Sequence, residues 1–96
     1  TAEEAKQIMD SEEGYIILDV RTQEEYDQGH IPGATQISHE KIADKAEEVL
    51  TDNDQLILVY CRSGRRSKIA AEALVELGYT NIKEFGGIID WPYEVE

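Results

Sequence analysis

Near its middle the sequence reads Leu56-Ile57-Leu58-Val59-Tyr60-Cys61-Arg62-Ser63-Gly64-Arg65-Arg66-Ser67. The first five of these residues are apolar throughout, which is the pattern of a strand covered on both faces, as in a parallel sheet. A short polar loop follows from Cys61 to Arg66, and Ser67 is a residue type that caps helices. The stretch therefore predicts a strand, a loop and a helix in direct succession.

The rest of the chain alternates in the same way. The run from Tyr15 to Val20 predicts a second buried strand. Helical spacing of apolar residues predicts three helices. The first covers residues 2–10 and opens with a capping box at Thr1-Ala2-Glu3-Glu4; the second covers residues 42–50, with one apolar stripe of Ile42, Ala43, Ala46, Val49 and Leu50. The third begins at Ser67 and is stopped by Gly78, and its inward residues are Ile69, Ala70, Ala73, Leu74 and Leu77. Shorter elements are expected at 24–28 (helix, ended by Gly29), 36–37 (strand), 81–85 (strand, broken by Gly86-Gly87) and 88–91 (helical turn).

Strands separated by helical patterns indicate βαβ units. We therefore expect an α/β fold of three layers, with a small, mainly parallel sheet between helices. The length of 96 residues suits one core, so the expected organisation is a single domain over residues 1–96.

Composition narrows the classes of partner. The formal net charge is -12, from 21 acidic against 9 basic residues, and such a surface repels nucleic acid and anionic membranes. The apolar stretches are also far shorter than a membrane-spanning helix, which needs about 20 residues. We expect neither a nucleic acid nor a membrane as partner.

Cys61 is the only cysteine, so no intrachain disulfide and no multi-cysteine metal site can form. A domain with one thiol suits a reducing compartment, and no signal-peptide pattern opens the chain. We expect a cytoplasmic location and no metal.

The loop after Tyr60 is the candidate site. In open α/β sheets, ligands bind at the carboxyl ends of strands, which is where Cys61 stands. Gly64 permits unusual backbone angles, so successive amides can form an anion-binding nest at the start of a helix. Four of the nine basic residues also lie here: Arg62, Arg65, Arg66 and Lys68. A helix N-terminus and nearby guanidinium groups favour thiolate, so Cys61 is predicted to be a reactive nucleophile and its ligand an anion.

At these residues the chain resembles a known family. The segment Cys61 to Ser67 is similar to the active-site loop of single-domain rhodaneses, which are sulfurtransferases. Further likenesses to the family follow in the same order along the chain: Leu18-Asp19-Val20-Arg21, Glu25-Tyr26, Gly29-His30-Ile31-Pro32-Gly33-Ala34, Gly78-Tyr79, and Gly86-Gly87 through Trp91. The family usually has a short strand before its first helix, and here the chain starts at the helix cap.

The resemblance implies a small rhodanese-like α/β domain and a double-displacement reaction. Cys61 would take a sulfane sulfur from a donor such as thiosulfate, hold it as a persulfide and pass it to cyanide, a thiol or a partner sulfur-carrier protein. The loop residues that would bind the donor and persulfide are Arg62, Ser63, Gly64, Arg65, Arg66 and Ser67. No metal or organic cofactor is implied.

Two other functions remain open at this point. Related phosphatases and some arsenate reductases place an arginine six positions after the cysteine, whereas this chain has Ser67 there and Arg66 one residue earlier. That shorter loop suits a persulfide better than a tetrahedral phosphate. The second alternative is a sulfur-relay or protein-interaction module with little activity on small donors.

Several other side chains receive structural interpretations. Asp19 and Arg21 are expected to tie loops together through a charge-assisted hydrogen bond. We expect His30 to fix a loop, and His39 to lie at the surface. Trp91 and Tyr93 are expected to cover the core edge. Acid pairs such as Glu12-Glu13, Glu24-Glu25 and Glu47-Glu48 are expected on solvated faces.

Overall fold

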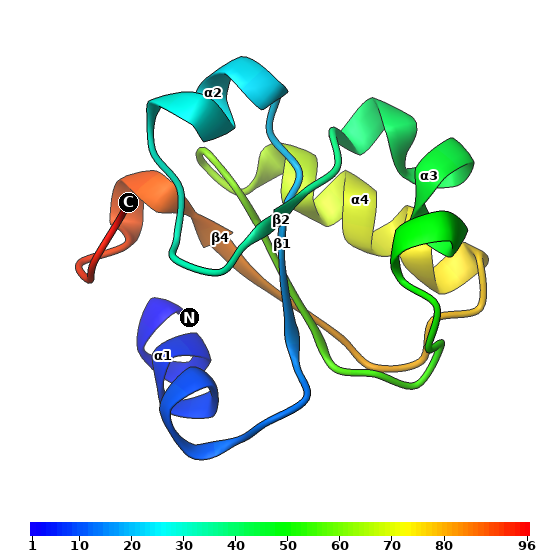
Figure 1. Ribbon diagram of the computed structural model, residues 1–96, viewed down its shortest axis with the longest axis horizontal. Helices are drawn as coiled ribbons and strands as arrows, with labels where there is room; N and C mark the ends of the chain where they lie inside the picture. Colours follow the sequence, from blue (N-terminus) through cyan, green and yellow to red (C-terminus); the bar gives the residue numbers. More distant parts are fainter.

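The computed structural model describes residues 1–96. Figure 1 shows the strands in the middle of the molecule with helices around them. In chain order the elements are α1 (Ala2–Ser11), β1 (Ile16–Asp19), α2 (Gln23–Gln28), β2 (Thr35–Gln36), the 3-10 helix η1 (His39–Lys41), α3 (Ile42–Val49), β3 (Ile57–Cys61), α4 (Arg65–Glu76), β4 (Ile82–Gly87) and the 3-10 turn η2 (Ile88–Asp90).

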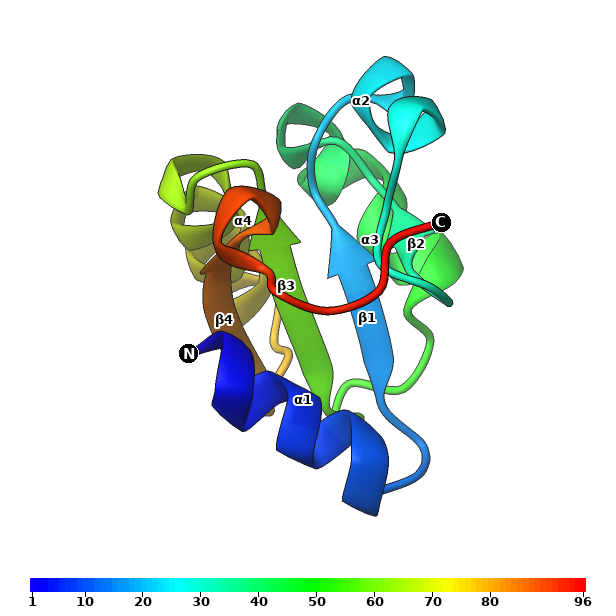
Figure 2. The ribbon, with the colours of Figure 1, turned by 90° about the vertical axis from the view of Figure 1, so that its left-hand side faces the viewer.

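The four strands form one sheet in the order β2-β1-β3-β4, and every neighbouring pair is parallel. Helix α1 lies on one face, and α3 and α4 lie on the other (Figure 2). The expected α/β class and its three layers are therefore confirmed. None of the helices is long and apolar enough to cross a lipid bilayer.

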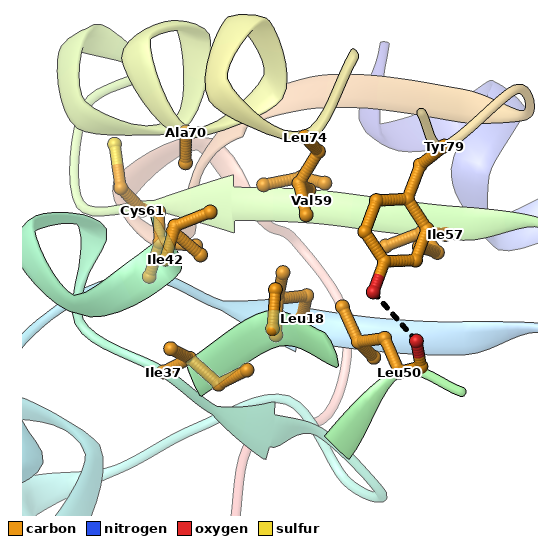
Figure 3. Close-up of a cluster of buried hydrophobic side chains, with 12 residues drawn as sticks. Leu18, Ile37, Ile42, Leu50, Ile57, Val59, Cys61, Ala70, Leu74 and Tyr79 are labelled. Atoms are coloured by element: carbon orange, nitrogen blue, oxygen red, sulfur yellow. Dashed lines mark hydrogen bonds between the residues drawn. The ribbon is translucent and has the colours of Figure 1, made fainter. Parts of the chain in front are cut away.

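The larger core lies between the sheet and helices α3 and α4 (Figure 3). Leu18 of β1 and Val59 of β3 point into it, as does Leu74 of α4, and all three are fully buried. The Tyr79 hydroxyl donates a 2.6 Å hydrogen bond to the Leu50 carbonyl oxygen, so the end of α3 is fixed to the segment that follows α4. Cys61 belongs to this cluster, at the end of the sheet where α4 begins.

A second cluster covers the opposite face. There Ala5 of α1 packs with Ile17, Leu58 and residues near the C-terminus. Phe85 lies between Tyr60 and Trp91, with ring centroids 5.5 and 5.6 Å away, so Trp91 covers the core edge as expected. The two clusters explain why β1 and β3 are apolar on both faces.

Four details of the sequence predictions are wrong. Ser67 does not cap α4: the N-cap is Gly64, with φ of 108°, and Ser67 is a buried residue of the first turn. The Gly86-Gly87 pair does not break β4, which continues to Gly87 with a shift of register against β3, and Gly87 leaves room for the backbone of the neighbouring loop. Ile69 and Val49 are 45% and 46% exposed, since each lies at the margin of its helix's apolar stripe.

Asp19 ends β1 as a fully buried carboxylate with two side-chain partners, Arg21 and Tyr60. Its oxygens accept hydrogen bonds from Arg21 Nη2 at 2.6 Å and from the Tyr60 hydroxyl at 2.7 Å. The Tyr60 oxygen in turn accepts the Ile31 amide at 3.1 Å, and Arg21 also donates to the Gly29 carbonyl. The expected link between Asp19 and Arg21 is thus present, and it anchors the segment after α2 to the sheet.

Replacement of Asp19 by Ala should lower the free energy of unfolding by about 3 to 5 kcal/mol, because Arg21 is then left buried without a counter-charge. Urea denaturation at neutral pH measures the loss. Tyr60→Phe removes one neutral donor to the same carboxylate and should cost only about 1 to 3 kcal/mol. A loss below about 1 kcal/mol for Asp19→Ala would contradict a central role for this network.

Candidate functional site

The parallel sheet gathers several of the predicted residues at one edge. Because all four strands run the same way, their carboxyl ends lie together. Asp19 pairs in register beside Tyr60, and Cys61 pairs beside Gly87. The loop that leads from β3 to α4 therefore emerges between the ends of β1 and β4.

Cys61 is the last residue of β3, and its side chain is 1% exposed. Gly64 adopts a left-handed conformation that glycine tolerates best, and this turns its amide back toward the sulfur. The amide nitrogen of Gly64 lies 2.9 Å from Cys61 Sγ. Figure 3 shows the sulfur at the end of β3, beside the first turns of α4.

The surroundings of the thiol act on its pKa in two directions. Burial raises the pKa of Cys61, whereas the contact with the Ser67 side chain and hydrogen bonds from the amides of Ser67, Gly64 and Ser63 lower it. The hydrogen bonds prevail, so the pKa of the thiol lies below its ordinary value. The loop thus favours a negative charge on this sulfur.

Strand β4 forms the wall behind the loop, and it approaches the loop backbone closely. A Cβ atom added at Gly87 would lie 2.0 Å from the carbonyl oxygen of Arg62, so only glycine fits there. The same carbonyl oxygen accepts the Ile89 amide at 3.2 Å. These contacts fix the backbone of the loop from its outer side.

The three loop arginines have different surroundings. Arg66 is partly buried and donates two hydrogen bonds to the Glu25 carboxylate, of 2.7 and 2.9 Å. Arg62 and Arg65 are exposed and form no ion pair. The free positive charge at the site therefore comes from these two guanidinium groups.

Glu25 is a site residue that the sequence analysis assigned to a solvated face, and that assignment is wrong. It belongs to α2, where it completes a capping box with Thr22. The hydrogen bonds from Arg66 and Thr22 lower the pKa of Glu25 to about 2, despite the opposing effect of partial burial. The capping-box spacing was visible in the sequence, but nothing there indicated that α2 would face the loop.

A cavity of about 260 Å³ opens beside the loop. Arg62 and Glu25 line it together with an apolar side formed by Ile88, Ile89 and Val95. Ile89 is 58% exposed. The cavity meets the loop at Arg62, and Cys61 is not among the residues that line it.

Other predicted residues lie away from the sulfur. His30 donates from Nδ1 to the Tyr26 carbonyl oxygen at 3.0 Å and stacks on the Tyr26 ring, so it fixes a loop as expected. His39 is half-buried in η1. No group of three or more His, Cys, Asp or Glu side chains is placed to hold a metal ion.

The fold and the site together define an α/β domain with a buried cysteine in a loop whose amides face the sulfur. A family model described as Rhodanese-like domain matches residues 1–92. The chain belongs to the rhodanese-like domain family.

Relatives and solved structures agree with this assignment. YrkF of Bacillus subtilis, which its name assigns provisionally to sulfur carrier proteins, is 40% identical over 92 residues, which are 95% of this chain and 49% of YrkF. Thiosulfate sulfurtransferase PspE of Escherichia coli is 37% identical over 73 residues, which are 76% of this chain and 70% of PspE. A solved structure titled rhodanese with anions, from E. coli, has a TM-score of 0.79 and 33% identity, over 85% of this chain and 96% of that one. The chain spans about half the length of YrkF.

The Glu25 and Arg66 pair predicts a specific pH dependence. A carboxyl group whose pKa is lower in the folded than in the unfolded protein stabilises the fold above its unfolded value near 4.5, and this stabilisation is lost as the pH falls toward about 2. Glu25→Gln should therefore lower the free energy of unfolding at pH 7 by about 1 to 2 kcal/mol, since the pair is partly exposed. The difference from the parent protein should shrink between pH 4.5 and 2.

Urea denaturation at several pH values measures that difference. Glu24→Gln is the matched control, because Glu24 is exposed in the same helix and makes no hydrogen bond through its side chain. If the difference in unfolding free energy between Glu25→Gln and the parent protein stays constant from pH 7 down to about pH 2, the charge of the pair contributes nothing to stability.

Proposed function

We propose that this protein is a sulfurtransferase in which Cys61 carries the transferred sulfur as a persulfide. The observation that carries the proposal is the geometry of the loop, where the amide of Gly64 lies 2.9 Å from Sγ and the pKa of the thiol is lowered. The names of the relatives support a sulfane sulfur as the cargo, since PspE is named a thiosulfate sulfurtransferase. Residues 1–96 act as one domain in this proposal.

In the first half-reaction the Cys61 thiolate attacks the outer sulfur of thiosulfate. A new S–S bond forms at Sγ, the bond between the two sulfur atoms of thiosulfate breaks, and sulfite leaves with that electron pair. The product is a Cys61 persulfide anion. The amides of Ser63, Gly64 and Ser67, which hydrogen-bond to Cys61, stabilise its negative charge.

In the second half-reaction a nucleophile takes the outer sulfur. Cyanide attacks it, a C–S bond forms, the S–S bond breaks, and its electron pair returns to Sγ as thiolate, with thiocyanate as product. A thiolate acceptor reacts in the same way and becomes a persulfide. Reduced thiols are abundant in the cytoplasm, where we propose that the reaction takes place.

Arg62 and Arg65 attract the anionic donor in this scheme. Arg66 adds positive charge next to the sulfur, but its guanidinium is held by Glu25, so its main role is to position the loop. A phosphatase or arsenate reductase needs the arginine side chain around a tetrahedral oxyanion. The Glu25 bond keeps Arg66 from such a ligand, and Ser67 occupies the following position.

A sulfur-relay role differs from this proposal in its partners. The donor would then be a persulfide on another protein, and the name of YrkF points toward a carrier protein. Such a module would accept sulfur from a partner persulfide while thiosulfate leaves Cys61 unchanged.

Cys61→Ser should abolish thiocyanate formation from thiosulfate and cyanide, because the serine hydroxyl is not ionised at neutral pH and forms no persulfide. The buried side chain changes little in size, so the variant should stay folded by circular dichroism. Retention of full activity by Cys61→Ser would remove Cys61 from the mechanism.

Arg62→Ala and Arg65→Ala should each raise the KM for thiosulfate by about three- to tenfold, because each removes an unpaired positive charge at the site. The kcat should change less, and stability should stay within about 0.5 kcal/mol, since both side chains are exposed. Lys68→Ala, which removes an exposed positive charge one turn further along α4, is the control and should leave the KM nearly unchanged. Unchanged kinetics in both arginine variants would show that the loop backbone alone binds the donor.

A further inference from the structure

Glu84 is a half-buried carboxylate that β4 places behind the active-site loop. Its Oε2 accepts hydrogen bonds from Ser67 Oγ at 2.5 Å and from the Gly86 amide at 2.7 Å. Ser67 is fully buried, and its Oγ lies 3.5 Å from Cys61 Sγ. One hydroxyl group therefore connects Glu84 to the thiol.

That hydroxyl has a single hydrogen and several acceptors. The Glu84 carboxylate lies at 2.5 Å, and the carbonyl oxygens of Gly64 and Gly86 lie at 3.0 and 3.3 Å. Hydrogen bonds to a carboxylate are shorter and roughly twice as strong as those between neutral groups. The hydrogen of Ser67 therefore points to Glu84 in the resting protein.

The direction of this hydrogen matters for the sulfur. When it points to Glu84, the oxygen presents lone pairs to Sγ, and these accept a hydrogen bond from a thiol but repel a thiolate. When it points to Sγ, the same hydroxyl stabilises the thiolate. Ser67 cannot donate to both acceptors at once.

We propose that Glu84 is a positioning residue that competes with Cys61 for the hydrogen of Ser67 and thereby limits how readily the thiol ionises. The importance of this control for turnover rests on the proposed role of Cys61 as the nucleophile. The effect of Glu84 on the ionisation of the thiol does not rest on that role, because it involves only the protein and a proton.

Substitution of Glu84 by Gln isolates this effect. The Ser67 hydroxyl and the Gly86 amide both bind the same oxygen, Oε2. A Gln carbonyl oxygen in its place still accepts the Gly86 amide, but as a neutral acceptor it binds the hydroxyl hydrogen of Ser67 less strongly, so that hydrogen turns more readily toward Sγ. The other charged groups on the loop and on the elements around Cys61 stay the same in this variant: Arg62, Arg65, Arg66, Lys68, Asp19, Arg21, Glu25, His39, Lys41, Lys83 and Asp90.

The ultraviolet absorbance of the thiolate, followed against pH, gives the titration midpoint of Cys61 directly, since it is the only cysteine. Glu84→Gln should move the midpoint down by about one pH unit, a tenfold change in the ionisation equilibrium. Glu72→Gln removes one negative charge from the exposed side of α4, away from Ser67, and should move it by less than about 0.2 units.

A Ser67→Ala background separates the relay through the hydroxyl from a direct effect of charge. The double variant Ser67→Ala, Glu84→Gln should have the same titration midpoint as the single variant Ser67→Ala. An equal shift in the presence and absence of Ser67 would overturn the proposal in favour of charge acting through space, and so would an unmoved midpoint in folded Glu84→Gln.

Thermal unfolding confirms that each variant is folded. Glu84→Met, of similar length but without charge, is the second variant in case the Gln variant does not fold, and the same downward shift is expected. Because the titration needs no sulfur donor, its result is independent of sulfur transfer, which thiocyanate formation by the unmodified protein measures separately.

Discussion

The hydrogen bond from the Gly64 amide to the Cys61 sulfur joins the end of a strand to the start of a helix. It needs a left-handed residue at Gly64, and it needs α4 to begin directly afterwards so that further amides face the same point. The sheet order then places the ends of β1 and β4 on either side of this loop. The position of the thiol thus follows from how tightly the chain turns between β3 and α4.

Charge around this turn is distributed unevenly, and the unevenness serves the site. A chain of net charge -12 keeps four of its nine basic residues within eight positions of one another. One of them, Arg66, is bonded to Glu25, which fixes α2 against the loop at the cost of some free positive charge. Arg62 and Arg65 remain available to anions, while Glu84 and Asp19 hold negative charge behind the loop and beside it.

Much of this arrangement could be predicted from the sequence. The apolar runs at 15–20 and 56–60 predicted two buried strands, and their alternation with helical patterns predicted the parallel sheet, because these patterns depend on local burial. The position of Cys61 at the carboxyl end of a strand was also predicted correctly, while its role as nucleophile stays a prediction. The capping boxes at Thr1 and Thr22 show how local spacing sets where α1 and α2 begin.

The parts that escaped prediction depend on contacts between distant segments. Glu25 lies 41 positions from Arg66, and Glu84 lies 17 positions from Ser67, so no local pattern connects them. The assignment of Ser67 as a cap failed because its hydroxyl is engaged by the half-buried Glu84 carboxylate and by the Gly64 carbonyl. Glycine is required at position 87 because the Arg62 carbonyl lies against it, and this contact exists only in the folded chain.

Intact mass spectrometry of the protein after incubation with thiosulfate, and again after cyanide, tests the central claim most directly. The account predicts the gain of one sulfur atom on Cys61 and its complete removal by cyanide with release of thiocyanate. A folded protein with a free thiol that gains no sulfur from thiosulfate would contradict it.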